Sequence, residues 1–90
     1  MINFAILGAG FIAEVHARNI AAHPRARLVH VVDVDAAKAE ALCESFGGQP
    51  DTTPTAALAD LEVDAVIIAS ATAAHGEQVP LVASACKAIL

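Results

Sequence analysis

The chain is poor in the residues with which proteins hold nucleic acids. It has 90 residues with no tryptophan or tyrosine and three phenylalanines, so it lacks aromatic platforms on which single-stranded bases stack. Its five lysines and arginines do not cluster, and ten acidic residues give a net charge of −5. This excludes the basic footprint of a duplex-binding protein. We therefore expect no nucleic-acid partner.

Cysteines and long apolar runs are also scarce. The two cysteines, Cys43 and Cys86, form no Cys-x-x-Cys motif and have no neighbouring histidine, so neither a metal site nor redox chemistry is indicated. The most apolar stretches, 63–74 and 79–85, fall short of the roughly 18 uninterrupted apolar residues of a membrane span. The N-terminal stretch lacks the basic start of a secretory signal peptide. We expect a soluble, cytoplasmic domain with no membrane partner.

What the sequence does contain is an alternation of strand-like and helix-like segments. Apolar, β-branched runs predict strands at 3–7, 28–34, 49–52, 65–69 and 88–90. Helical patterns predict helices at 11–22, at 36–46, just after Pro54, and at 77–86. Residues 65–69 are apolar on both faces, as expected of a central parallel strand. His30 alternates with valines and is expected to be a structural residue of its strand.

The helix predicted at 36–46 has clear end signals. Asp35 is a good N-cap, and Gly47 supplies the left-handed residue that commonly ends a helix. One apolar face follows the i, i+3, i+4, i+7 spacing: Ala39, Leu42, Cys43 and Phe46. For the short helix that follows, Thr53 is the expected N-cap, with Pro54 at the first helical position.

This alternation predicts an α/β fold. We expect a Rossmann-type, doubly wound parallel sheet with right-handed crossovers and the strand order 3-2-1-4-5. No repeat or linker divides the chain, so residues 1–90 are expected to form one dinucleotide-binding domain. The sequence stops within the last expected strand. The sheet is therefore expected to be truncated after its fifth strand, with a C-terminal substrate domain absent from this chain.

The first chemical motif is Gly8-Ala9-Gly10-Phe11-Ile12-Ala13, which matches G-x-G-x-x-A directly between a predicted strand and a predicted helix. Gly8 permits the tight turn, and Gly10 lets a pyrophosphate approach the backbone. Ala13 is small enough for close helix–strand packing. The backbone N–H groups at the helix start, including those of Phe11 and Ile12, then face the phosphates. This motif predicts a dinucleotide site.

The second motif is an acidic residue 20 positions after Ala13, which is Asp33. A carboxylate at the end of the second strand accepts hydrogen bonds from the adenosine ribose and repels a 2′-phosphate. With Val34 beside it and no arginine following, the spacing favours NAD over NADP. Lys38 is the nearest cation, and Asp35 is assigned to the helix cap.

The third element follows from topology. In the order 3-2-1-4 the first and fourth strands are neighbours, and ligands bind in the crevice where their crossovers diverge. The loop after 65–69 is expected to line this crevice on its nicotinamide side, with Ser70, Thr72 and His75 offering polar atoms. The alternative for the two hydroxyls is a loop or cap hydrogen bond. For His75 it is packing at a helix terminus.

These motifs resemble the Gfo/Idh/MocA family of oxidoreductases over the whole chain, in order and at the family's spacing. The segments that carry the resemblance are Gly-Ala-Gly-Phe-Ile-Ala-Glu-Val-His-Ala (8–17), Val-Val-Asp-Val-Asp (31–35), Val-Asp-Ala-Val-Ile-Ile-Ala-Ser (63–70), Ala-His-Gly-Glu-Gln (74–78) and Lys-Ala-Ile-Leu (87–90). The chain departs from the family at Phe11 and Ala13, where arginine and glycine are frequent, and at 70–72, where Thr-Pro-Asn is frequent.

The resemblance implies the NAD(P)-binding part of a dehydrogenase, similar to inositol dehydrogenases. Such an enzyme moves hydride between the nicotinamide and a cyclitol, sugar or related polyol. The family's Glu-Lys-Pro motif, whose lysine assists proton transfer, would follow Leu90. No catalytic residue is therefore expected in this chain, and homo-oligomerisation is expected through the missing domain.

Two alternatives remain open from the sequence. One is a stand-alone nucleotide-binding or sensing module without catalysis, and the other is a Rossmann-like domain for a different adenosyl ligand. The second would not need both the glycine motif and Asp33. Codons for Glu-Lys-Pro after Leu90 would indicate the enzyme, and a stop codon would indicate the module.

Overall fold

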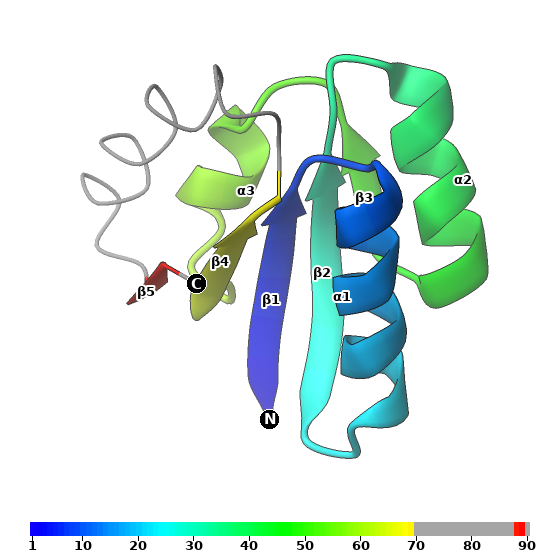
Figure 1. The fold of residues 1–90 in the computed structure, drawn as a ribbon. Helices are drawn as coiled ribbons and strands as arrows, with labels where there is room; N and C mark the ends of the chain where they lie inside the picture. The colour runs from blue at the N-terminus through cyan, green and yellow to red at the C-terminus, as the bar shows by residue number, and fades with distance from the viewer. Residues whose placement is uncertain (70–87, 90) are drawn as a thin grey trace.

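A five-stranded parallel sheet forms the centre of the molecule (Figure 1). The computed structural model describes residues 1–69 and 88–89. The strands are β1 (Ile2–Leu7), β2 (Ala26–Val32), β3 (Gln49–Asp51), β4 (Ala65–Ile68) and β5 (Ala88–Ile89). The helices are α1 (Phe11–Ala22), α2 (Ala36–Phe46) and α3 (Thr55–Ala59). The strand order β3-β2-β1-β4-β5 confirms the predicted topology and the doubly wound α/β class. The helix predicted at 77–86 lies outside the described residues.

The central strand β1 pairs with β2 on one side and with β4 on the other. Its last residue, Leu7, is aligned with Val32 and with Ile68, the last residues of those two strands. The three strands therefore end together at one edge of the sheet, and the loops that leave them begin side by side. In doubly wound sheets this edge, at the point where the strand order reverses, is where ligands bind.

Side-chain alternation along β1 divides the apolar core into two layers. Ile6 packs with α1 and α2, whereas Ala5 and Leu7 pack on the side of α3. The first layer contains Ile6, Ala9, Ala13, Ala17, Ile20, Leu28, Val31, Ala39, Leu42 and Ile67. The second contains Ala5, Leu7, Val32, Ala57, Val63, Val66 and Ile68. All four residues of β4 are buried, as predicted for a central strand. Removal of this apolar surface from water is the main force that holds the sheet and helices together.

The helix α1 lies close to the sheet because the residues that face the sheet are small. Ala13 and Ala17 are fully buried in the first core layer, and Ile20 is nearly so. Ala13 thus takes the packing position predicted for it. A larger side chain at either alanine would push the start of α1 away from the end of β1.

The helix α2 begins and ends where the sequence predicts. The Asp35 carboxylate accepts a hydrogen bond from the Ala37 N–H at 3.1 Å, which confirms Asp35 as the N-cap. Gly47 ends the helix with φ of 87°, and its N–H donates to the Cys43 carbonyl at 2.8 Å. The predicted apolar face packs against the first core layer: Ala39, Leu42, Cys43 and Phe46.

The predicted bounds of β2 are wrong by two residues at each end. The strand begins at Ala26 rather than at Leu28 and ends at Val32 rather than at Val34. It ends early because the Asp33 carboxylate accepts the Asp35 N–H at 2.8 Å. A side chain that bonds the backbone two residues later turns the chain.

The prediction of Thr53 as the N-cap of the short helix is also wrong. The N-cap of α3 is Pro54, and the helix starts at Thr55. Pro54 has φ of −75° and ψ of −5°, close to helical values, because its ring restricts φ. No side chain caps the first turn of this helix.

A bulge in β2 interrupts the alternation that the sequence suggested around His30. Phe4 of β1 is aligned with Leu28, but Ala5 is aligned with His30, so Val29 is the extra residue. Val29 packs against the second core layer, and the His30 ring contacts the end of α3 on that same side. The bulge thus turns His30 toward α3, a contact that strict alternation would not have predicted.

The sequence analysis also addressed cysteine, metal sites and membrane spans, and the described residues bear on each. Cys43 has a free, half-buried thiol whose pKa is raised by burial and by the negative charge of Asp51. Within residues 1–69 and 88–89, no cluster of histidine, cysteine and acidic residues is suited to hold a metal ion. None of the helices in that same part of the chain has the length and apolar character to span a membrane.

Replacement of Gly47 by alanine should lower the free energy of unfolding by about 1–2 kcal/mol, because its φ of 87° suits glycine and strains other residues. Urea unfolding measures this change. Ser45→Ala on the exposed side of α2 is the control and should stay within about 0.5 kcal/mol of the parent. Equal stability of Gly47→Ala and the control would contradict the proposed backbone constraint.

Candidate functional site at the carboxyl edge of the sheet

A tight turn leads from β1 into α1. Gly8 has φ of 113°, which favours glycine, and its N–H donates to the Val32 carbonyl at 2.6 Å. The turn therefore rests on the end of β2. This conformation agrees with the role that the sequence predicted for Gly8.

Unlike Gly8, Gly10 does not adopt a backbone conformation that favours glycine. Its φ of −86° and ψ of −161° are open to any residue, and a Cβ at this position would meet no atom of the described chain within 4 Å. Neither backbone conformation nor internal packing excludes a side chain here. The absence of a side chain instead leaves open space in front of the start of α1, as a ligand that approaches the backbone would need.

The start of α1 presents backbone donors to this space. The first intrahelical hydrogen bond runs from the Glu14 N–H to the Gly10 carbonyl at 3.0 Å, and no side chain caps the helix. The N–H groups of Phe11, Ile12 and Ala13 precede that bond. Such groups, together with the positive end of the helix dipole, form an anion site.

The Asp33 carboxylate joins two loops of the site. One oxygen accepts the Ala9 N–H at 2.8 Å, and the other accepts the Asp35 N–H at 2.8 Å. Asp33 is half-buried, and these two bonds hold its carboxylate in place at the carboxyl edge of the sheet. A carboxylate has about four acceptor positions, so about two remain for hydroxyl donors of a ligand.

Exposed apolar side chains lie in or directly after the two loops that the Asp33 carboxylate joins. Phe11 is 77% exposed and Ile12 56% exposed, both within the first turn of α1. Val34, which directly follows Asp33, is 93% exposed. Large apolar side chains at such exposure gain stability if a ligand covers them.

Three predicted site residues, Ser70, Thr72 and His75, lie outside the described residues. The chain that leads to them does begin at the predicted edge. The Ala69 N–H, directly after β4, donates to the Leu7 carbonyl at 2.9 Å, next to the glycine turn.

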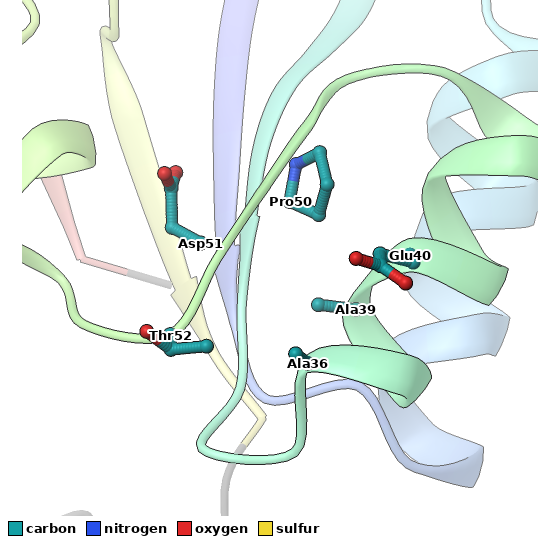
Figure 2. Close-up of a pocket in the computed structure, with 6 residues that line it drawn as sticks. All are labelled: Ala36, Ala39, Glu40, Pro50, Asp51 and Thr52. Atoms are coloured by element: carbon teal, nitrogen blue, oxygen red, sulfur yellow. The ribbon is translucent and has the colours of Figure 1, made fainter.

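In the part of the chain that the structure describes, cavities of about 260 Å³ lie on two sides of α2, and neither is lined by a predicted site residue. One lies between α1 and α2 and is lined in part by Ala9, Lys38 and Phe46. The other lies between α2 and β3, where Figure 2 shows Glu40 and Pro50 on the side of α2. The carboxylate of Glu40 in its lining disfavours a phosphate ligand. The candidate site is therefore placed at the carboxyl edge of β1, β2 and β4 and not in one of these cavities.

Sequence reasoning missed one residue that supports Asp33. The Asp33 N–H donates to the main-chain carbonyl of Asp51, at the end of β3, at 3.0 Å. A main-chain acceptor on another strand has no signature in side-chain identity, so only the pairing of β2 with β3 shows it.

Comparison with known proteins agrees with this geometry. Residues 2–90 match the model of GFO_IDH_MocA, an oxidoreductase family with an NAD-binding Rossmann fold. The chain belongs to the Gfo/Idh/MocA family. The resemblance inferred from the sequence is thereby confirmed.

Three relatives show what this Gfo/Idh/MocA chain is similar to. Inositol 2-dehydrogenase of Rhizobium meliloti (strain 1021) is 39% identical over 88 residues, which are 98% of this chain and 26% of that protein. Myo-inositol dehydrogenase from Lactobacillus casei, solved with NAD(H) and myo-inositol, has a TM-score of 0.93 at 26% identity, over 99% of this chain and 27% of its own. Biliverdin reductase from Synechocystis sp. PCC 6803, solved with biliverdin and NADP+, has a TM-score of 0.89 at 26% identity. The match covers 98% of this chain and 28% of the reductase chain.

This chain spans about a quarter of the length of these relatives. Their solved complexes hold NAD(H) in one case and NADP+ in another. Membership of the family therefore does not choose between the two cofactors.

Proposed function

We propose that this chain is the NAD-binding part of a dehydrogenase that acts on a cyclitol, sugar or related polyol. The observation that carries the proposal is Gly10, whose missing side chain is required neither by backbone conformation nor by packing within the described chain. A ligand that approaches the main chain at the start of α1 explains it. The inositol dehydrogenases among the relatives support the substrate class.

The pyrophosphate of NAD is assigned to the start of α1. The N–H groups of Phe11, Ile12 and Ala13 precede the first intrahelical bond and suit phosphate oxygens. No lysine or arginine lies between Gly8 and Ala13, so the backbone donors and the helix dipole supply the attraction. The conformation of Gly8 sets the direction of the turn and so the orientation of these backbone N–H groups.

The adenosine ribose is assigned to Asp33. Its carboxylate is held by Ala9 and Asp35 and still has acceptor positions for ribose hydroxyls. The same negative charge repels a 2′-phosphate, which is the physical reason to prefer NAD to NADP. The exposed apolar surfaces of Phe11, two residues after Ala9, and of Val34, next to Asp33, suit the apolar faces of the adenosine.

The nicotinamide side of the site is assigned to Ser70, Thr72 and His75. This part of the proposal rests on topology, because the segment leaves β4 beside the glycine turn. When bound, the nicotinamide supplies the acceptor or donor of hydride. The described residues of this chain bind and orient the cofactor, and no acid–base role is assigned to any of them. The polyol, the proton-transfer group and the contacts of a homo-oligomer are assigned to the rest of the protein.

Gly10→Ala should lower NAD affinity by about tenfold or more, which corresponds to at least about 1.4 kcal/mol, because a methyl group would occupy the space left for the pyrophosphate. Its free energy of unfolding should stay within about 1 kcal/mol of the parent, since the new Cβ meets no protein atom. Calorimetric titration with NAD and urea unfolding measure the two effects.

The matched control is Gly47→Ala at the C-terminal end of α2, which should lose stability and keep the parent's NAD affinity. Parent-like NAD affinity in Gly10→Ala would contradict the placement of the pyrophosphate.

Asp33→Ala should weaken NAD binding by about 1–3 kcal/mol, because charged hydrogen bonds to the ribose are lost. It should also raise NADP affinity relative to NAD, because the repulsion of a 2′-phosphate is removed. Titrations of parent and variant with both cofactors give the comparison. Glu40→Ala, which removes an exposed carboxylate of α2, should leave the ratio of the two affinities unchanged. Equal NAD and NADP affinity in the parent would defeat the assignment.

A further inference from the structure

His30 is the one buried polar or charged residue within residues 1–69, at 4% exposure. Its ring lies between two carboxylates from different parts of the chain. Nδ1 is 2.9 Å from Oδ2 of Asp51, and Nε2 is 2.8 Å from Oδ2 of Asp60. We call these three side chains the His30 cluster.

The chemistry of the cluster defines which atoms donate. An ionised carboxylate only accepts hydrogen bonds, so each ring nitrogen must donate in order to bond it. The imidazolium form donates from both nitrogens and satisfies both carboxylates, whereas a neutral ring satisfies one. All three side chains are largely removed from water, at 6%, 14% and 27% exposure for His30, Asp51 and Asp60. We call the His30–Asp51 and His30–Asp60 hydrogen bonds the two arms of the cluster. Loss of either arm leaves a ring nitrogen of His30 without a partner and poorly solvated.

The two arms of the cluster lead to different parts of the fold. Asp51 is the last residue of β3, and Figure 2 shows its carboxylate directed away from the side of Pro50 and Glu40. Asp60 ends α3, and its other oxygen accepts the Glu62 N–H in the loop toward β4.

The Asp51 arm reaches the cofactor site. β3 is a three-residue edge strand that contains Pro50, which has no N–H to donate, so its backbone pairing with β2 is sparse. The His30–Asp51 bond adds a largely buried side-chain hydrogen bond between the same two strands. The main-chain carbonyl of Asp51 in turn accepts the Asp33 N–H at 3.0 Å.

We propose that His30 is a positioning residue for the cofactor site: through Asp51 it holds the backbone of Asp33, and hence the ribose-binding carboxylate, in place. This inference rests on the proposed function of Asp33. The contacts of Asp60 with the His30 ring and with the Glu62 N–H instead tie α3 and the loop toward β4 to β2, away from Asp33. The two arms therefore provide an internal comparison with the same residue type and the same histidine.

The test compares Asp51→Ala with Asp60→Ala in the intact protein, with NAD affinity measured by calorimetry and stability by thermal unfolding. Both variants should lower the unfolding temperature, because each leaves one nitrogen of His30 without its carboxylate. Asp51→Ala should weaken NAD binding by about fivefold, whereas Asp60→Ala should stay within about twofold of the parent. Asp51→Asn, which keeps an oxygen that accepts from Nδ1, should recover most of the affinity.

A second comparison separates an effect on the position of the Asp33 carboxylate from a general loss of stability of the fold. In an Asp33→Ala background, Asp51→Ala should change NAD affinity by less than about twofold, because the carboxylate that it positions is already gone. Equal losses of affinity in Asp51→Ala and Asp60→Ala, or an undiminished effect of Asp51→Ala in that background, would overturn the proposal. If Asp51→Ala fails to fold, Asp51→Glu and Asp60→Glu are scored by the same criterion.

The outcomes also separate this inference from the proposed function. If Asp33→Ala leaves NAD affinity unchanged, the ribose assignment itself fails. If Asp33→Ala weakens binding and Asp51→Ala does not, the ribose assignment stands and the positioning role of His30 is wrong.

Discussion

The hydrogen bond from the Ala9 N–H to the Asp33 carboxylate is the interaction on which the site depends. It joins the loop after β1 to the loop after β2, which otherwise meet at the end of the sheet through the bond from Gly8 to Val32. Because the same carboxylate also accepts the Asp35 N–H, it sets the turn into α2. One side chain thus fixes both the direction of the glycine turn and the place of the negative charge.

This arrangement has a consequence for specificity. A carboxylate that the fold needs for its own backbone donors cannot be rotated away when a ligand carries a phosphate at the ribose. The preference for NAD in the proposed function is therefore tied to the local structure of two loops. The main-chain carbonyl of Asp51 accepts the Asp33 N–H, and the Asp51 carboxylate bonds the His30 ring, so the edge strand β3 is linked to this loop.

Local signals in the sequence were sufficient for most of the fold. The periodic apolar face of α2, its cap at Asp35 and its end at Gly47 lie where predicted, because each depends on residues within one or two helical turns. The strand order followed from alternation and handedness. The end of β2 was misjudged because Val34 has high strand propensity, while the bond from Asp33 to the Asp35 N–H ends the strand before it.

What the sequence could not predict depends on contacts between distant residues. The bulge at Val29 turns His30 toward the face of the sheet that α3 covers. There its ring bonds Asp51 at the end of β3 and Asp60 at the end of α3. No local sequence pattern indicates either of these pairings. The glycine motif and Asp33 were found by spacing, but the bond that joins them appears only when the loops are seen together. The open space at Gly10 likewise needed the structure.

A crystal structure of the intact protein with NAD tests the central claim most directly. The account predicts that an adenosine ribose hydroxyl lies within hydrogen-bonding distance of the Asp33 carboxylate, that the Ala9 N–H still donates to that carboxylate, and that the pyrophosphate lies against the start of α1 next to Gly10. A complex in which the ribose contacts other residues, or in which the Asp33 carboxylate has left Ala9, would contradict it.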